Sequence, residues 1–223
     1  MTSLGRVLAT SGSTVLLTST LLAFSGTAAH ADTSWSGTLT SGIAAISVGT
    51  EDRTGYSRDL FRHWVDADGD GCDTRYEVLI VEAITRPDVR AGCYLANGRW
   101  YSAYDGVVTT DPSSFDIDHV VPLAEAWDSG AFAWPSTRRR AYANDLGDPR
   151  PLRAVTASTN RSKGDDAPEE WLPPRSAFRC RYLAEWVAVK TRWNLAVDRA
   201  ERDALRSMLG RCATTTIRIR LAP

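Results

Sequence analysis

The sequence of 223 residues predicts a single α+β domain. A β-branched run, VLIVEAI at 78–84, is typical of a strand, and CYLANGRWYSAYDGVV at 93–108 is typical of a hairpin that turns at Asn97-Gly98. Two amphipathic stretches near the C-terminus, 178–191 and 198–209, are typical of helices. The sequence contains no internal repeat and no linker-like segment, so one core of good size is expected.

The first 31 residues have the pattern of a secretory signal peptide. A single charge, Arg6, precedes an apolar stretch at 14–24, and the segment ends in Ala29-His30-Ala31, a small-x-small cleavage pattern. The apolar stretch is shorter than the ~20 residues that a membrane-spanning helix needs. We therefore expect cleavage after Ala31 and a secreted, extracellular protein that has no membrane anchor.

The segment that follows the predicted signal peptide is less regular. Residues 32–50 are rich in Ser, Thr and Gly, so we expect a flexible lead-in with at most a short helix at 39–48. The domain itself is then expected to span 51–223. Its first stretch, 51–65, is predicted to be helical, with the apolar face formed by Leu60, Phe61 and Trp64.

Four cysteines, an even number, suit an oxidising compartment. Three pairings are possible, and the cost of closing long loops favours Cys72–Cys93 together with Cys180–Cys212. A structural zinc site is the alternative. It is disfavoured because the sequence has no C-x-x-C pair and only two histidines after residue 31.

The stretch that indicates chemistry begins at Phe115. Asp116, Asp118 and His119 lie within four residues and are followed by Val-Val-Pro. An Asp directly before a His combines a hard oxygen ligand with a group that titrates at about pH 6.5. Within a strand the two side chains point to opposite faces, but at a strand end both can reach one metal-bound phosphate. A buried histidine with a structural role is the alternative interpretation.

These residues and two later motifs resemble the HNH (ββα-metal) endonucleases, in particular secreted members related to the C-terminal domain of GmrSD restriction endonucleases. The same D-x-D-H-x-V-P and N-R-x-K arrangement occurs in the HNH domain of RNA-guided CRISPR nucleases. The resemblance implies a ββα-metal core to which the hairpin and the C-terminal helices are added. It rests on three ordered elements, Asp116-x-Asp118-His119-Val-Val-Pro122, Asn144, and Asn160-Arg161-Ser162-Lys163-Gly164-Asp165 with Pro168 and Trp171.

The resemblance also implies a role for each residue of the site. His119 is the general base that takes a proton from the attacking water. Asp118 and Asn160 are the protein ligands of a divalent cation, Mg²⁺ or another ion such as Mn²⁺. Asn144 is the middle Asn of the H-N-H name and orients the base, whereas Asp116 is a neighbour of the ligands rather than a ligand itself.

Charge is distributed unevenly along the chain. The 26 basic and 27 acidic residues nearly balance, which excludes a protein that coats nucleic acid by bulk charge. Between residues 138 and 163, however, the sequence contains seven basic residues and only two acidic ones. A solvated face is one explanation, but beside the motif we favour a phosphate-binding rim that includes Arg139, Arg161 and Lys163. The expected substrate is DNA, with RNA as an alternative, and it is cleaved with little sequence preference by a monomer.

A second motif, Asp66-x-Asp68-x-Asp70-Gly71-x5-Glu77, matches the 12-residue calcium loop of an EF-hand. The four acidic residues would offer carboxylates, and Cys72 its backbone carbonyl. Because a strand is predicted where an EF-hand has its exiting helix, we expect this loop on another scaffold. A bound Ca²⁺ would be structural if Cys72 pairs with Cys93, and an acidic turn without an ion is the alternative.

Together these features predict an exported, metal-dependent HNH nuclease. The first alternative is a non-catalytic, secreted calcium-binding module, which Ca²⁺ would stabilise but which would cleave no phosphodiester bond. A hydrolase that uses paired carboxylates on glycans is a weaker alternative, because no Asp or Glu pair in the sequence has a distinctive context for that chemistry.

Overall fold

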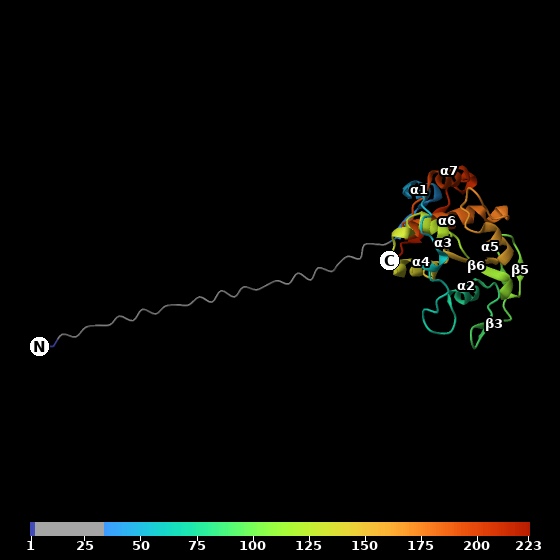
Figure 1. Cartoon of the computed structure of the whole chain (residues 1–223), viewed down its shortest axis with the longest axis horizontal. Coiled ribbons are helices and arrows are strands. Elements are labelled where there is room, and N and C mark those ends of the chain that lie inside the picture. The colour runs from blue at the N-terminus through green and yellow to red at the C-terminus, as the bar shows by residue number, and fades with distance from the viewer. Residues whose placement is uncertain (3–33) are drawn as a thin grey trace. The chain divides into compact units, whose positions relative to one another are not determined.

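The computed structural model describes residues 1–2 and 34–223, so the predicted signal peptide and its cleavage site lie almost wholly outside the described residues. From residue 34 onward, helices and short strands form one unit, as predicted for a single α+β domain (Figure 1). The helices are α1 (Leu39–Ala45), α2 (Thr74–Glu82), α3 (Leu123–Asp128), α4 (Ser136–Ala143), α5 (Ala157–Lys163), α6 (Arg179–Trp193) and α7 (Arg199–Ser207). The strands are β1 (Ser34–Thr38), β2 (Asp88–Arg90), β3 (Tyr94–Ala96), β4 (Trp100–Tyr101), β5 (Val108–Thr109), β6 (Phe115–His119), β7 (Leu152–Thr156) and β8 (Thr216–Arg220).

The segment expected to be a flexible lead-in at 32–50 is folded where the structure describes it. β1 pairs antiparallel with β8, so the start and the end of the domain form one ribbon. α1 then buries Leu39 and Ile43, which lie four positions apart on one helix face, in the main core. Two well-placed apolar side chains therefore outweigh the Ser/Thr-rich composition that suggested mobility.

The strand predicted at 78–84 is wrong, because most of these residues belong to helix α2. Asp73 caps this helix by accepting hydrogen bonds from the backbone N–H groups of Arg75 and Tyr76. Val78 and Leu79 are then buried while their neighbour Val81 stays exposed. The cap and one-sided burial override the β propensity of the run.

The helix predicted at 51–65 is also wrong. Only a single 3-10 turn, Arg58–Leu60, forms there, and Gly55 and Trp64 have positive φ values of 77° and 55°. Of the predicted apolar face, Phe61 is fully buried but Leu60 is exposed. The segment is held by the buried Phe61 ring and by bonds to other parts of the domain, such as those between Asn144 and the backbone groups of Arg62 and Val65, rather than by helical hydrogen bonds.

The region predicted to be one hairpin at 93–108 forms parts of two. β3 pairs with β2, and β4 pairs with β5, so Asn97-Gly98 connects two ribbons instead of turning within one. Asn97 does adopt the left-handed conformation that suits a turn, and its side-chain amide donates to Asp88. The turn signal was therefore correct locally, but the strand partners were not those predicted.

At the centre of the domain, β6 and β7 pair antiparallel and α5 begins directly after β7. α5 packs against both strands, and α3 and α4 lie within the connection between the strands. The order of strand, strand and helix is the backbone arrangement that the family resemblance implied.

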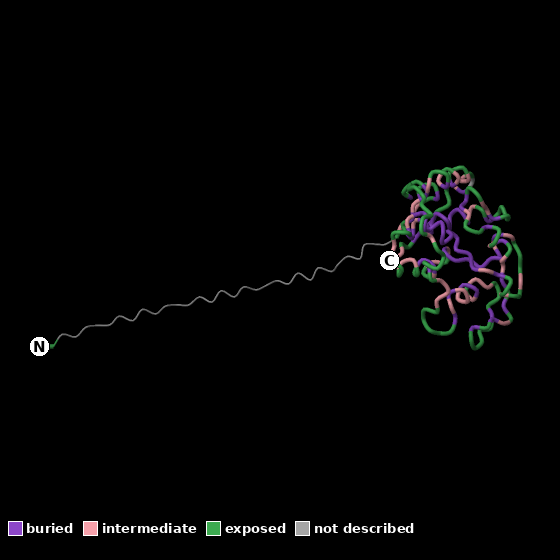
Figure 2. Tube along the Cα trace, in the orientation of Figure 1, coloured by how far each residue is buried: buried purple, intermediate pink, exposed green. Residues whose placement is uncertain are grey.

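Buried segments run through the interior of the domain (Figure 2), and their apolar side chains form two clusters to which β6 and β7 contribute. The larger cluster is built around α6, which buries Tyr182, Trp186 and Trp193, and the smaller cluster includes Leu79 and Trp100. The predicted C-terminal helices are confirmed as α6 and α7.

Both predicted disulfides are confirmed. Cys72–Cys93 joins the loop before α2 to the β2–β3 turn, with a Cα–Cα distance of 5.1 Å. Cys180–Cys212 joins α6 to the segment before β8, with a Cα–Cα distance of 5.4 Å. Each bridge thus fixes an edge of the domain to a buried element.

Candidate active site

Strand β6 directs two carboxylates toward helix α5. Alternate residues of a strand point to opposite faces, so Ile117 enters the smaller apolar cluster while Asp116 and Asp118 face the helix. There the side-chain amide of Asn160 donates to Asp116 over 3.3 Å, and the ammonium group of Lys163 donates to Asp118 over 2.8 Å. The helix spacing of three residues places both partners on one face of α5.

A pocket of about 300 Å³ opens where β6 ends beside α5. Its lining includes the neighbours Asp118 and His119 at the end of β6, together with Asn160, which lies about forty positions later on α5. His119 is the last residue of β6, and this position lets its ring reach the same pocket as the preceding carboxylate. Arg58 and Arg161 bring positive charge to the walls of this pocket.

The ring of His119 is held from several sides. Its Nε2 lies 3.0 Å from the backbone carbonyl of Ala143. Because a carbonyl only accepts, Nε2 carries the proton and Nδ1 keeps the lone pair. The ring also stacks on Trp64 and on Tyr142, with centroid distances of 5.7 and 6.4 Å.

Burial lowers the pKa of His119 from 6.5 to about 3, because the charged ring would lose its hydration. The bond to Ala143 acts in the opposite direction, and the positive charge of Arg58 lowers the pKa further. The ring is therefore neutral at pH 7 and has one basic nitrogen.

Asn144 fixes the end of α4 next to this histidine. It directly follows Ala143, whose carbonyl holds the ring, and it ties α4 to the segment that carries Trp64. This surrounding network agrees with an orienting role for Asn144. Its side-chain oxygen accepts from the Val65 N–H and the Thr74 hydroxyl, at 3.0 and 2.9 Å, and its side-chain nitrogen donates to the carbonyls of Arg62 and Arg140, both at 2.8 Å.

The Asp118 carboxylate is clamped by two buried donors. Lys163, which is fully buried, binds one oxygen, and the hydroxyl of Tyr104 binds the other over 2.6 Å. The Lys163 ammonium group also donates to the backbone carbonyl of His119 over 3.0 Å. No sequence pattern pointed to Tyr104, which lies on the loop between β4 and β5, and Lys163 was expected to bind phosphate rather than Asp118.

Of the three predicted phosphate-binding residues, only Arg161 lines the pocket. Lys163 is engaged by Asp118, and the guanidinium group of Arg139 donates to three backbone carbonyls while lying over the ring of Trp127. Both of these groups therefore have internal partners instead of facing a substrate.

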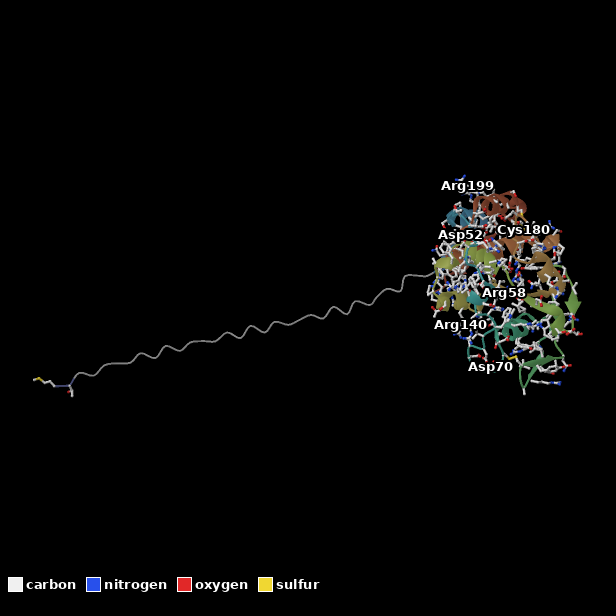
Figure 3. All side chains as sticks on the ribbon, viewed as in Figure 1. Asp52, Arg58, Asp70, Arg140, Cys180 and Arg199 are labelled. Atoms are coloured by element: carbon white, nitrogen blue, oxygen red, sulfur yellow. A yellow bond between two sulfur atoms is a disulfide. The ribbon has the colours of Figure 1, made fainter. Side chains whose placement is uncertain are left out.

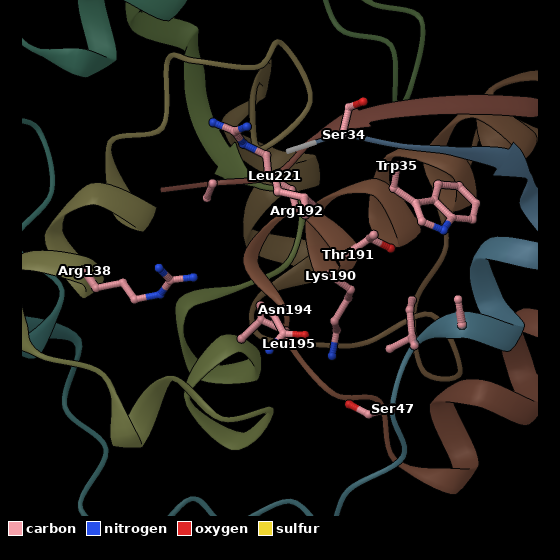
Figure 4. Close-up of a pocket in the computed structure, with 13 residues that line it drawn as sticks. Ser34, Trp35, Ser47, Arg138, Lys190, Thr191, Arg192, Asn194, Leu195 and Leu221 are labelled. Atoms are coloured by element: carbon pink, nitrogen blue, oxygen red, sulfur yellow. The ribbon is translucent and has the colours of Figure 1, made fainter. Parts of the chain in front are cut away.

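A second pocket, of about 390 Å³, lies between β1, the end of α1 and the end of α6 (Figure 4). Lys190 and Arg192 extend toward it, but each is already paired. Lys190 binds Glu125 and Glu201, and Arg192 binds Asp145. These pairs offset the charges of Lys190 and Arg192, and no carboxylate or histidine lines this pocket among the described residues, so we look for the chemistry at the end of β6.

Comparison with known proteins identifies the family of the chain. The model of the family described as "GmrSD restriction endonucleases, C-terminal domain" matches residues 75–208. The chain belongs to this family. The resemblance to the C-terminal domain of GmrSD restriction endonucleases is thereby confirmed, and β6, β7 and α5 all lie within the matched residues.

The GmrSD C-terminal domain family is one of endonuclease domains, which indicates nuclease activity and a nucleic-acid substrate. The chain is 45% identical over 174 residues to a protein of Arthroderma benhamiae named "Uncharacterized secreted protein", an alignment that covers 78% of this chain and 83% of that protein. No solved structure matches the chain. None of the helices among the described residues has the length and apolar character needed to cross a membrane.

Proposed function

We propose that this protein is a metal-dependent endonuclease of the HNH type that hydrolyses phosphodiester bonds of DNA. The observation that carries the proposal is the common pocket of Asp118, His119 and Asn160. Hydrolysis of a phosphodiester requires a base for the attacking water and positive charge for the phosphate oxygens. The pocket brings the residue types for both requirements to the end of one strand.

In this proposal, Nδ1 of His119 accepts the proton of the attacking water. Burial keeps the ring neutral, and the hydrogen bond to Ala143 commits Nε2 and so determines which nitrogen acts. Asn144 maintains this orientation through the end of α4. The base therefore needs no rearrangement of its own before it acts.

The residues present fit a divalent cation such as Mg²⁺ or Mn²⁺, held by Asp118 and Asn160. Carboxylate and amide oxygens are the hard donors that these ions prefer. A carboxylate has roughly four lone-pair positions, so the bonds from Lys163 and Tyr104 leave Asp118 capacity for an ion. The side-chain nitrogen of Asn160 donates to Asp116, so the side-chain oxygen of Asn160 is the atom that would bind the ion. When bound, the cation makes a coordinated water more acidic and offsets charge on the phosphate.

Arg161 is the proposed phosphate-binding residue on α5. It is exposed and lines the pocket, so its guanidinium fork can meet a phosphate with two hydrogen bonds. Contacts of this kind are made to the backbone and are independent of sequence. We therefore expect cleavage of DNA, with RNA as an alternative substrate, at little sequence preference.

We also propose that the protein is secreted. The relative of Arthroderma benhamiae carries the word "secreted" in its name, and the signal-like N-terminus of this chain agrees with export. The two disulfides support the same compartment, because such bonds persist in oxidising surroundings.

The function is tested most directly with supercoiled plasmid. The purified protein is expected to convert plasmid to nicked or linear DNA in millimolar Mg²⁺, and excess EDTA is expected to abolish the conversion. Gel electrophoresis over time gives the rate, and the protein carrying His119→Ala serves as the control for contaminating nucleases. Cleavage that continues unchanged in EDTA would contradict the metal-dependent mechanism.

The acidic loop at 66–77 supports a second function, calcium binding, either beside catalysis or instead of it. Helix α2 begins at Thr74 within the loop and includes Glu77, so the surroundings are closer to an EF-hand than the predicted strand suggested. Carboxylate oxygens of Asp66, Asp68 and Asp70 lie within 4.8 Å of one another. Partial burial, followed by the charges of these three residues, raises the pKa of Glu77. A cation would relieve this mutual repulsion.

Calcium is expected to stabilise the protein if this loop binds it. At a concentration 100-fold above Kd, the gain in unfolding free energy is about 2.7 kcal/mol, which raises Tm by roughly 5–10 °C for a domain of this size. Scanning calorimetry with Ca²⁺ and with EDTA measures the shift. Glu77→Gln, which removes the carboxylate at the twelfth position of the loop, should abolish the shift, whereas Glu170→Gln, the same change at an exposed acidic residue outside the loop, should not. An equal shift in both variants would assign the effect to another site.

A further inference from the structure

We propose that Arg58 binds a phosphate group of the nucleic-acid strand that enters the pocket, an inference that rests on the proposed function. Arg58 begins the 3-10 turn Arg58–Leu60 and lines the pocket together with Asp118 and His119 (Arg58 is labelled in Figure 3). It lies 61 positions before His119, in a segment that precedes the part matched by the family model. Its position at the site is therefore visible only in the fold.

The guanidinium group of Arg58 is available to a ligand. Among residues 1–2 and 34–223, none forms an ion pair with it, and its side chain takes part in no hydrogen bond. Lys163 and Arg139 differ in this respect, since Lys163 is bound by Asp118 and Arg139 by backbone carbonyls. An exposed, unpaired arginine that lines a catalytic pocket is suited to a phosphate, whose oxygens match its donor fork.

The backbone that carries Arg58 is fixed. The Ser57 hydroxyl caps the turn by accepting from the N–H of Asp59 over 3.3 Å. Phe61 is fully buried and packs edge-on against Trp127 and Tyr142. Binding a phosphate therefore orders only the arginine side chain, which keeps the entropy cost of the contact small.

The charges around the pocket also favour an anion. Arg58 and Arg161 reach it from two different elements, the 3-10 turn and α5. The charge of Asp118 is offset by Lys163, which leaves Asp165 as the lining carboxylate without such a partner among the described residues. A nucleic-acid backbone, which carries one charge per phosphate, can thus be held from both sides while the central carboxylate stays available for a cation.

The experiment compares Arg58→Ala, Arg58→Lys and Arg199→Ala. Arg199 is an exposed arginine on α7 that does not line the pocket, so it is matched in charge (Figure 3). Binding of a fluorescent DNA duplex is followed by anisotropy between about 50 and 200 mM salt, with each change made in the non-cleaving His119→Ala protein. Loss of one phosphate contact reduces the slope of log K against log salt by about 0.9.

For Arg58→Ala we expect the slope of log K against log salt to fall by about 0.9. For Arg58→Lys, which keeps the charge, we expect an unchanged slope but weaker binding. Arg199→Ala should change neither the slope nor the affinity. In the cleaving protein, Arg58→Ala should lower kcat/KM by at least ~10-fold. An unchanged slope for Arg58→Ala, or an equal change for Arg199→Ala, would overturn the inference while the proposed function stands. If the wild-type protein cleaves no DNA in Mg²⁺, the proposed function itself fails. If Arg58→Ala lowers Tm, the salt dependence of binding is measured with Arg58→Gln instead, because glutamine removes the charge but keeps most of the side chain.

Discussion

Replacing His119 by alanine is expected to lower kcat for DNA cleavage by a factor of ~10²–10⁴, the range that a positioned general base contributes. The neutral imidazole of His119 lines the pocket, and its bond to the Ala143 carbonyl leaves Nδ1 as the basic nitrogen. Alanine removes this nitrogen. Single-turnover cleavage of a labelled duplex at saturating protein measures the effect without a contribution from product release.

His63 provides the matched control. It also lies beside Trp64, but its Nδ1 contacts the carbonyl of Phe61 and its ring does not line the pocket. His63→Ala should therefore retain a rate within about threefold of the wild type. Equal losses in the two variants would mean that the aromatic stack, and not the base, is what cleavage requires.

The pH dependence of His119 has a definite sign. Since burial holds its pKa at about 3, the ring is already in the basic form at about pH 5, and its titration should leave kcat/KM flat from there to pH 7. The lowered pKa also implies that this group's contribution to stability is complete above pH 6.5 and is lost as the pH falls toward 3. An activity profile that falls with a midpoint near pH 6.5 would show that the ring is solvated when it acts.

The centre of the site could be predicted because its determinants are local. Asp118 and His119 are neighbours in the sequence, and the period of a strand together with the strand end decides where both side chains point. Asn160 sits on the helix that immediately follows the paired strand. The disulfides were likewise accessible, because loop closure favours near pairings.

The remaining errors come from tertiary contacts that override local patterns. The β-branched run at 78–84 became part of a helix once Asp73 capped it, and the Asn97-Gly98 turn gained different strand partners. Arg58 could not be found from the sequence at all, since it lies in an irregular segment that the buried Phe61 and the bonds of Asn144 hold beside the pocket. Long-range packing of this kind leaves no periodic signal.

The expected role of Lys163 changes once its surroundings in the fold are known. An exposed lysine beside a nuclease motif suggests phosphate binding, whereas a lysine with no exposed surface that contacts Asp118 stabilises the site from within. We expect Lys163→Met to lower the free energy of unfolding by about 3–5 kcal/mol, because it leaves a buried carboxylate without its charge partner. Urea unfolding in EDTA measures this loss without a contribution from bound metal.

Tyr104 and Tyr182 form a matched pair for measuring the hydrogen bond to Asp118. Both rings are fully buried and in edge-on contact, 5.6 Å apart, but only the Tyr104 hydroxyl binds Asp118, while that of Tyr182 has no partner among the described residues. Tyr104→Phe should therefore cost about 1.5–3 kcal/mol, the value of a hydrogen bond to a charged group, and Tyr182→Phe close to nothing. If Lys163 instead faced solvent, its replacement would change stability by no more than about 0.5 kcal/mol, as at other surface positions. Suppose that Lys163→Met lowers the free energy of unfolding by no more than this, and that the two tyrosine variants lose equal amounts. Lys163 would then be a phosphate-binding residue, as first predicted, and only the cation would hold Asp118.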